Sequence, residues 1–294
     1  MPKISIITPT YNSDKFIKRT INSVLNQTYQ DWEYLIVDDS STDNTTEIIN
    51  DFIKKDKRIR LYKTIENSGG PARPKNIALA KADGEYIAFL DHDDCWLENK
   101  LEEQLNVFNK LGEDKTALVY SYIDIRGSNF RLLSKHKKSY SGDVLKYITL
   151  DCFILTSSCA LIKAKVIKEV GFFDTDLKIK DDWDMWLKIA EAGYNFNFVP
   201  INLTSYISHE LNSNLNKKNK LENDDYILIY EKHFDTFLKF NLKAIGHYYF
   251  CKQDYKKARI YFFKNIFSYN VLFEQRIKSV VFLILSFFPK LKII

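Results

Sequence analysis

Residues 86–96, Y-I-A-F-L-D-H-D-D-C-W, join a short apolar run directly to three carboxylates within four residues. The apolar run has the length and aromatic character of a strand that is buried on both faces of a sheet. The acids Asp91, Asp93 and Asp94 follow the carboxyl end of that strand, which is where open α/β sheets bind ligands. Carboxylates this close repel one another, and a divalent cation would offset the repulsion. The stretch therefore predicts either a hard-cation site for a phosphate ligand or a solvated turn that caps a helix.

The sequence before this stretch alternates between predicted strands and helices. Apolar runs typical of strands occupy residues 4–7, 34–37 and 59–62, and apolar residues recur at helical spacing over 14–27. Such alternation predicts an α/β fold with a mostly parallel central sheet and right-handed crossovers. The loops that follow the strands are then expected along one edge of the sheet, where a crevice can collect side chains from distant parts of the chain.

Polar loops follow each of these strands. Residues 8–12 (T-P-T-Y-N) follow the first strand, and residues 38–41 (D-D-S-S) follow the second. Residues 66–76 hold adjacent glycines, which permit close approach of the backbone to a ligand, and Arg73 and Lys75, which suit a phosphate. A plain surface loop is the alternative for this segment. Neither G-x-G-x-x-G nor a P-loop occurs in the chain, which excludes the usual dinucleotide dehydrogenases and P-loop phosphotransferases.

Composition limits the class of protein further. The 294 residues are 45% hydrophobic and 28% charged, which suits one large α/β domain with an appendage or two modest domains. The formal charge of +5 is mild and no basic run resembles a nucleic-acid arm, so nucleic acid is not expected as a partner. The four cysteines form no C-x-x-C pair, and neither a signal-peptide core nor the apolar run of about 20 residues that a membrane span requires is found. These features predict a cytoplasmic protein with reduced thiols.

Four motifs, in this order, resemble those of inverting family 2 glycosyltransferases of the bacterial surface-glycan type. The motifs are I-S-I-I-T-P-T-Y-N at 4–12, L-I-V-D-D-S-S-T-D-N-T at 35–45, G-E-Y-I-A-F-L-D-H-D-D at 84–94 and D-D-W-D-M-W-L at 181–187. The resemblance covers roughly residues 2–210. It implies the GT-A fold, an α/β architecture with a Rossmann-like, mostly parallel central sheet and flanking helices, followed here by a C-terminal helical appendage.

The resemblance assigns residues to the donor end of the site. It implies that Pro9, Tyr11 and Asp39 bind the nucleoside base, and a carboxylate is a suitable acceptor for the N3 proton of uracil. It also implies that Asp91 approaches the ribose and that Asp93 binds the Mn²⁺ or Mg²⁺ that bridges the two phosphates. The donor is accordingly expected to be a nucleotide-sugar, and in particular a UDP-sugar.

The acidic cluster at 181–187 corresponds to the catalytic motif of the family. Asp182 matches the general base, while Asp181 stands where relatives usually carry Glu. An inverting transfer requires such a base, because a carboxylate opposite the leaving diphosphate must take the proton of the attacking acceptor hydroxyl. Without the upstream motifs, the same residues would be interpreted as the acidic first turn of a helix over 183–190.

Two matches to the family leave alternatives open. Many relatives carry A-R-N where this chain has A-R-P-K-N at residues 72–76. Either Lys75 replaces the arginine at the diphosphate, which its spacing to residues 84–86 favours, or Arg73 reaches the same phosphate. His209 ends a stretch similar to the family's Y-x-x-H, and it is either a ligand of the metal or diphosphate or a loop histidine without such a role.

We expect a catalytic domain over residues 1–215 and a helical region over 216–294. Within the catalytic domain, the nucleotide-binding part covers about 1–112 and the acceptor part about 113–215. The acceptor part contains a basic segment, residues 130–140, that is predicted to be irregular and to contribute acceptor-binding loops.

The C-terminal region is predicted to consist of helices rich in Tyr, Phe and Lys over 221–240 and 244–267. A last segment, 276–294, mixes apolar residues with flanking lysines. One interpretation is a basic, aromatic face that rests on a membrane surface, which would make the protein peripheral at the inner face of the plasma membrane. The other is an interface of a homo-oligomer, or a helix that packs on the catalytic domain.

These expectations combine into one function, that of an inverting, metal-dependent hexosyltransferase. It would move a sugar from a nucleotide donor to a hydroxyl of a glycan or lipid-linked saccharide in polysaccharide biosynthesis. A sugar-1-phosphate nucleotidyltransferase is one alternative, but it ordinarily carries a glycine- and arginine-rich loop where this chain has T-P-T-Y-N. A non-catalytic relative that binds nucleotide or carbohydrate is another, and the presence of Asp93 and Asp182 argues against it.

Overall fold

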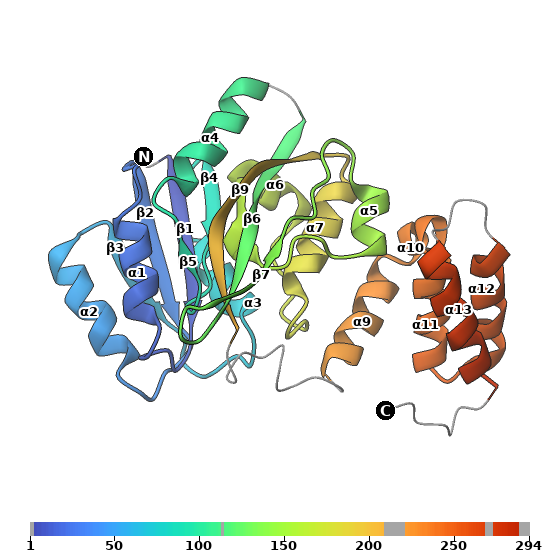
Figure 1. Ribbon diagram of the computed structural model, residues 1–294. Coiled ribbons are helices and arrows are strands. Elements are labelled where there is room, and N and C mark those ends of the chain that lie inside the picture. Colours follow the sequence, from blue (N-terminus) through green and yellow to red (C-terminus); the bar gives the residue numbers. More distant parts are fainter. Residues whose placement is uncertain (1–2, 113–114, 209–220, 268–272, 288–294) are drawn as a thin grey trace. The chain divides into compact units, whose positions relative to one another are not determined.

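The computed structural model of the protein describes residues 3–112, 115–208, 221–267 and 273–287 (Figure 1). The chain divides into two compact units. The first unit holds Met1–Ile148 with Cys152–Lys218, and the second holds Thr149–Asp151 with Asn219–Ile294. The first unit contains the sheet and its flanking helices, and the second contains the C-terminal helices. The predicted class, an α/β fold followed by a helical region, is confirmed.

The first part of the sheet is parallel and follows the predicted alternation of strands and helices. Its strands lie in the order β3-β2-β1-β4 (Figure 1). The elements are β1 (Ile4–Thr10), α1 (Ile17–Leu25), β2 (Trp32–Asp38), α2 (Thr45–Lys55), β3 (Ile59–Lys63), α3 (Ala72–Leu79) and β4 (Tyr86–Phe89). Ile7 in β1 pairs with Leu35 in β2 and Phe89 in β4, so the carboxyl ends of the three strands lie together.

The second part of the sheet is mixed. β8 pairs antiparallel with both β4 and β6, and β6 in turn pairs parallel with β9 and antiparallel with β7. The elements are β5 (Cys95–Trp96), α4 (Lys100–Leu111), β6 (Thr116–Gly127), β7 (Leu132–His136), α5 (Leu145–Leu150), the 3₁₀ helix η1 (Ser157–Cys159), β8 (Ala160–Lys163), α6 (Ala164–Val170), α7 (Asp181–Glu191) and β9 (Asn195–Ser208). Because β8 is the neighbour of β4, η1 lies beside the end of β4, where the acidic stretch begins.

Apolar side chains on both faces of the strands form the core of the first unit. On one face, Tyr34 and Ala88 belong to a buried cluster with residues of α1, α2 and α4, such as Ile21. On the other face, Phe89 meets Phe173 edge to face, with ring centroids 5.1 Å apart. Burial on both faces explains why these strands contain long apolar runs in sequence. The packed strands give the loops at their ends a rigid base.

Several local predictions are wrong, and pairing with distant strands explains two of them. β1 continues to Thr10, because its last residues pair with β2. Residues 132–136, predicted to be irregular, form β7, because the long strand β6 offers them a partner. The helix predicted over 183–190 begins two residues earlier, at Asp181, so both acids of the proposed catalytic motif belong to its first turn.

The second unit consists of helices that are shorter than predicted. They are α9 (Leu221–Lys232), α10 (Phe234–Phe240), α11 (Leu242–Cys251), α12 (Tyr255–Phe267) and α13 (Phe273–Leu285). The predicted long helix is interrupted between α11 and α12 at Gln253, whose φ of 60° lies in the left-handed region. Aromatic rings pack the helices together, as where Phe262 and Phe282 stack with centroids 5.4 Å apart. Within the described residues, no helix has both the length and the apolar character needed to cross a membrane.

Candidate active site

The loops that follow β1, β2 and β4 meet at one edge of the sheet, as predicted. The backbone N–H of Asp39 donates to the carbonyl oxygen of Thr10 at 2.8 Å, which joins the ends of β1 and β2. On the other side of β1, the Thr8 hydroxyl donates to the Leu90 carbonyl oxygen at 2.6 Å, and the Leu90 N–H donates to Ile7 at 2.9 Å. The acids that follow β2 and β4 therefore stand on either side of the loop after β1.

Two residues of α1 hold the backbone of the acidic loop. The Thr20 hydroxyl lies within donating distance of two carbonyl oxygens, that of His92 at 2.7 Å and that of Asp94 at 2.9 Å. The Arg19 guanidinium donates to the carbonyl oxygen of Asp93 at 3.3 Å. Sequence reasoning missed both residues, because a Thr and an Arg in an amphipathic helix give no signal of such a role. Their contacts fix the path of the loop that carries Asp93.

Side chains of the loop near η1 hold the acids from the other side. The Thr156 hydroxyl lies 3.1 Å from Oδ2 of Asp91 and 3.3 Å from Oδ2 of Asp94, and the Ser158 hydroxyl accepts the N–H of Asp91 at 2.9 Å. The buried Asp94 also accepts the N–H of Ile207 at 3.1 Å. Asp94 therefore ties β9 and η1 to the loop rather than capping a helix.

Burial and mutual repulsion both disfavour the ionised forms of acids in this loop. Burial raises the pKa of Asp94 well above its ordinary range, and the charges of Asp93 and Asp91 raise it further. Burial also raises the pKa of Asp91, against the opposing effect of the Lys75 ammonium, and Asp93 again adds to the rise. A cation bound at this loop would relieve the repulsion.

A buried ion pair links α3 to the start of α7. Nζ of Lys75 lies 2.9 Å from Oδ2 of Asp181, and each side chain is only 3% exposed. The Lys75 ammonium also lies 5.0 Å from the ring centroid of Phe173. Burial lowers the pKa of Lys75, but the carboxylates of Asp181, Asp91 and Asp182 raise it by more, so the lysine stays charged. Lys75 therefore lies close to acids of α7 and of the loop that follows β4.

Asp182 is half-buried in the first turn of α7, with one oxygen 2.7 Å from the N–H of Trp183. Burial raises its pKa to about 7, and the neighbouring charge of Asp181 adds to this rise while Lys75 and Lys180 oppose it. A carboxylate with a pKa near 7 is suited to accept a proton at neutral pH. The side chain matches the requirements of a general base.

The residues predicted to bind the nucleoside lie at the end of β1 and β2. Asp39 is buried, and its oxygens accept hydrogen bonds from the Thr64 hydroxyl at 2.9 Å and from the N–H and hydroxyl of Ser68 at 2.9 and 2.8 Å. Pro9 is buried within β1, whereas Tyr11, just beyond the strand, is 43% exposed. Asp39 therefore also fixes the start of the glycine-rich loop.

The two candidate phosphate ligands differ in accessibility. Lys75 is buried against Asp181, as described above. Arg73 is exposed on the first turn of α3, and its guanidinium lies 3.8 Å from the carboxylate of Glu66. The sequence favoured Lys75 over Arg73, but in this structure Arg73 is the one that reaches solvent. His209, the third uncertain match, lies outside the described residues.

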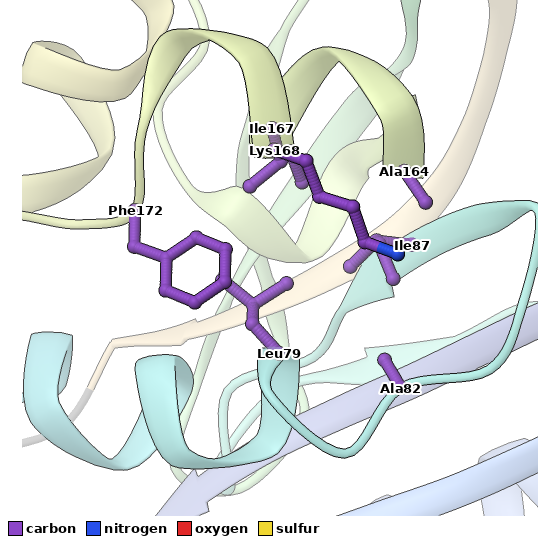
Figure 2. A pocket seen from close by; sticks show the side chains of 7 residues that line it. All are labelled: Leu79, Ala82, Ile87, Ala164, Ile167, Lys168 and Phe172. Carbon is purple, nitrogen blue, oxygen red and sulfur yellow. The ribbon is translucent and has the colours of Figure 1, made fainter.

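No complete metal site is formed by protein side chains alone in the described part of the chain, where no three His, Cys, Asp or Glu residues are arranged to hold an ion. A hollow elsewhere in the first unit, between α3 and α6, is lined by residues such as Leu79, Ile87, Ile167 and Phe172 (Figure 2). Its cavity volume of about 10 Å³ is far below the ~300–1,000 Å³ of typical ligand sites, and none of the acids lines it. We therefore place the candidate site at the acidic edge of the sheet.

Solved structures define the class of this fold. Staphylococcus aureus TarS, residues 1–349, in complex with UDP-GlcNAc is similar with a TM-score of 0.63 and 22% identity, over 97% of this chain and 81% of that chain. The mannosyltransferase PcManGT from Pyrobaculum calidifontis, in complex with GDP-Man and Mn²⁺, is similar with a TM-score of 0.60 and 17% identity, over 98% and 86%. The fold is that of GT-A glycosyltransferases, as predicted.

Sequence comparison then defines the family. The profile of glycosyl transferase family 2 matches residues 5–171, and the chain belongs to this family. An uncharacterized glycosyltransferase of Haemophilus influenzae is 44% identical over 150 residues, which are 51% of this chain and 57% of that protein. The UDP-Glc:alpha-D-GlcNAc-diphosphoundecaprenol beta-1,3-glucosyltransferase WfaP of Escherichia coli is 33% identical over 230 residues, which are 78% of this chain and 86% of that protein. The putative teichuronic acid biosynthesis glycosyltransferase TuaG of Bacillus subtilis is 33% identical over 194 residues, 66% of this chain and 74% of that protein.

Proposed function

We propose that the protein is an inverting, metal-dependent glycosyltransferase that moves a sugar from a UDP-sugar to a hydroxyl of a lipid-linked saccharide. The observation that carries the proposal is the gathering of Asp91, Asp181 and Asp182, from two distant segments, around the buried ammonium of Lys75. The relative WfaP supports the donor and acceptor classes, because its name specifies UDP-Glc and a diphosphoundecaprenol-linked sugar. Such an acceptor would place the protein at the inner face of the plasma membrane during surface polysaccharide synthesis.

Asp182 is proposed as the base that activates the acceptor. In an inverting transfer, the acceptor oxygen attacks the anomeric carbon in line with the departing diphosphate, so a new glycosidic bond forms as the bond to phosphate breaks. The hydroxyl proton moves to a carboxylate oxygen of Asp182 as the attack proceeds. The first turn of α7 holds this carboxylate, and the ion pair between Lys75 and Asp181 secures that turn to α3.

The donor nucleotide is proposed to lie along the ends of β1, β2 and β4. Pro9, Tyr11 and Asp39 would contact the base, and Asp91 the ribose. The exposed guanidinium of Arg73 is proposed to contact the diphosphate, with Lys75 as the alternative if it exchanges Asp181 for phosphate. The positions of these residues at one edge of a parallel sheet support this assignment.

The residues at the acidic loop fit a metal that is bound together with the donor. Asp93 would hold Mn²⁺ or Mg²⁺, because carboxylate oxygens suit these hard cations. His209 is a further candidate ligand of this ion. Burial, together with repulsion from Asp93, raises the pKa of Asp91 and of Asp94, so a bound cation would favour their ionised forms, and donor phosphate oxygens would complete the coordination. When bound, the ion would stabilise the charge that develops on the leaving diphosphate.

A thermal-shift screen of nucleotide sugars tests the donor and the metal together. With Mn²⁺ present, a UDP-sugar at about 100 times its Kd should stabilise the protein by about 2.7 kcal/mol, which raises Tm by roughly 5–10 °C for a domain of this size. EDTA should remove most of this shift, because Asp93 and the diphosphate would lose the ion that joins them. Transfer should then release UDP when acceptor is added. An equal shift in EDTA would contradict the metal, and an equal shift with GDP-sugars would contradict the choice of UDP.

The pH dependence of transfer follows from the raised pKa of Asp182. Below about pH 7 this carboxyl is protonated and cannot accept the acceptor proton, whereas above that pH it is ionised. We therefore expect kcat/KM to rise about tenfold per pH unit below pH 7 and to level off above it. Initial rates across that range, with donor affinity measured at each pH, provide the check. A flat profile through pH 7 would speak against Asp182 as the base.

A further inference from the structure

Helix α13 buries a serine and exposes several apolar residues. Ser279 is completely buried, whereas Ile284 is 56% exposed. Ile277, Val280 and Val281 are exposed as well, and with Ile284 they recur at the spacing of one helix face. We call these four residues the outer face of α13. A helix that faces water on one side normally shows the opposite arrangement, with its apolar stripe toward the core.

The inward face of α13 is occupied by contacts within the second unit. The buried Asn265 of α12 donates its Nδ2 to the Ser279 hydroxyl at 2.9 Å. Phe282 stacks on Phe262 of α12 and meets His247 of α11 at a centroid distance of 5.4 Å. These contacts fix the rotation of α13, so the outer face is turned away from α11 and α12. Figure 1 shows α11, α12 and α13 packed side by side in the second unit. Contiguous exposed apolar surface of this kind marks an interaction site.

The charge of this region indicates which partner the outer face takes. Residues 255–287 carry six Lys and Arg against one acid, whereas residues 1–218 carry 30 Lys and Arg against 31 acids. Lys278 is exposed on α13 itself, and Lys256 and Lys264 are exposed on α12. Two copies of so basic a surface would repel each other, but an anionic surface would attract it.

We propose that the outer face of α13 binds the surface of an anionic phospholipid membrane. The side chains of Ile277, Val280, Val281 and Ile284 would enter the boundary between headgroups and acyl chains, while Lys278 on the same helix contacts lipid phosphates. Apolar insertion and basic charge together supply the two signals that stable peripheral attachment requires. The attachment suits the lipid-linked acceptor proposed above, but it requires neither donor nor transfer.

Vesicle co-sedimentation with the full chain tests the proposal. Vesicles that contain phosphatidylglycerol should bind the protein more than about tenfold better than pure phosphatidylcholine, and high salt should weaken the binding. The double variant Val281→Asp/Ile284→Asp should reduce binding to anionic vesicles by more than about tenfold, because it removes apolar insertion and adds two negative charges. Leu111→Asp/Ile201→Asp, which places two aspartates at exposed apolar residues of the first unit, should bind as the parent does.

Equal binding to both vesicle types, unchanged binding of the α13 double variant, or an equal loss in Leu111→Asp/Ile201→Asp would overturn the proposal. A concentration-dependent dimer that the double variant dissolves, with vesicle binding unaffected, would also overturn it in favour of a second copy. Thermal unfolding of each variant shows whether a loss of vesicle binding comes from misfolding. UDP release with a water-soluble acceptor tests the proposed function separately from membrane binding. A variant that transfers sugar normally but no longer binds vesicles would support the proposal directly.

Discussion

The variant Asp182→Asn is expected to lower kcat by roughly 10²–10⁴-fold, the range attributable to a positioned general base. The amide has nearly the same shape as the carboxylate but cannot accept the proton of the attacking hydroxyl. The neighbouring ion pair between Lys75 and Asp181 should remain, because it involves a different residue of the turn. Donor affinity should therefore change little. Initial rates of UDP release with acceptor, combined with the thermal shift produced by the UDP-sugar, measure both quantities.

Asp176→Asn provides the matched control for this prediction. Asp176 is an exposed acid in the loop before α7, so the same change there alters the charge of the region without touching the candidate site. It should leave both kcat and donor affinity unchanged. Normal transfer by Asp182→Asn would refute the base assignment, and a rate loss accompanied by loss of the donor-induced shift would instead indicate a binding role.

The elements predicted correctly are those whose pattern is local. The apolar runs in β2 (residues 34–37) and β4 reflect burial on both faces of the parallel sheet, and each run is followed by acids that the strand geometry places at one edge. That edge was predicted because the carboxyl ends of parallel strands must lie together. The same reasoning places Asp39 and Asp91 at the ends of β2 and β4, on either side of β1, without any knowledge of the rest of the fold.

What the sequence did not reveal depends on contacts between distant segments. Lys75 and Asp181 are separated by more than 100 residues, and nothing local in either motif indicates that they pair. Thr20 and Thr156 hold the acidic loop from two sides through single hydroxyl groups, which are common in any sequence. Residues 132–136 form a strand only because β6 is long enough to pair with them, and their exposed, basic side chains resemble those of a loop.

The variant Lys75→Met is expected to be the most destabilising single change at the site. Removal of the ammonium would leave the carboxylate of Asp181 buried and unpaired, beside the acids Asp91 and Asp182. Breaking a buried ion pair in this way costs about 3–5 kcal/mol, or roughly 6–20 °C in Tm at ~2–4 °C per kcal/mol. Differential scanning calorimetry without ligand gives the measurement. Arg73→Met, at an exposed position two residues earlier, should change Tm by little.

The double variant Lys75→Met/Asp181→Leu decides whether the lost stability comes from an unpaired charge. Replacement of a whole buried ion pair by apolar residues is often neutral, so the double variant should recover most of the stability that Lys75→Met loses. A double variant no more stable than the single one would show that Lys75 contributes through packing instead.

In Lys75→Met, the pKa of Asp182 should also rise, because the ammonium opposes the effect of burial on that carboxyl. The acid limb of kcat/KM should accordingly move to higher pH, whereas a purely structural lysine would leave the limb in place.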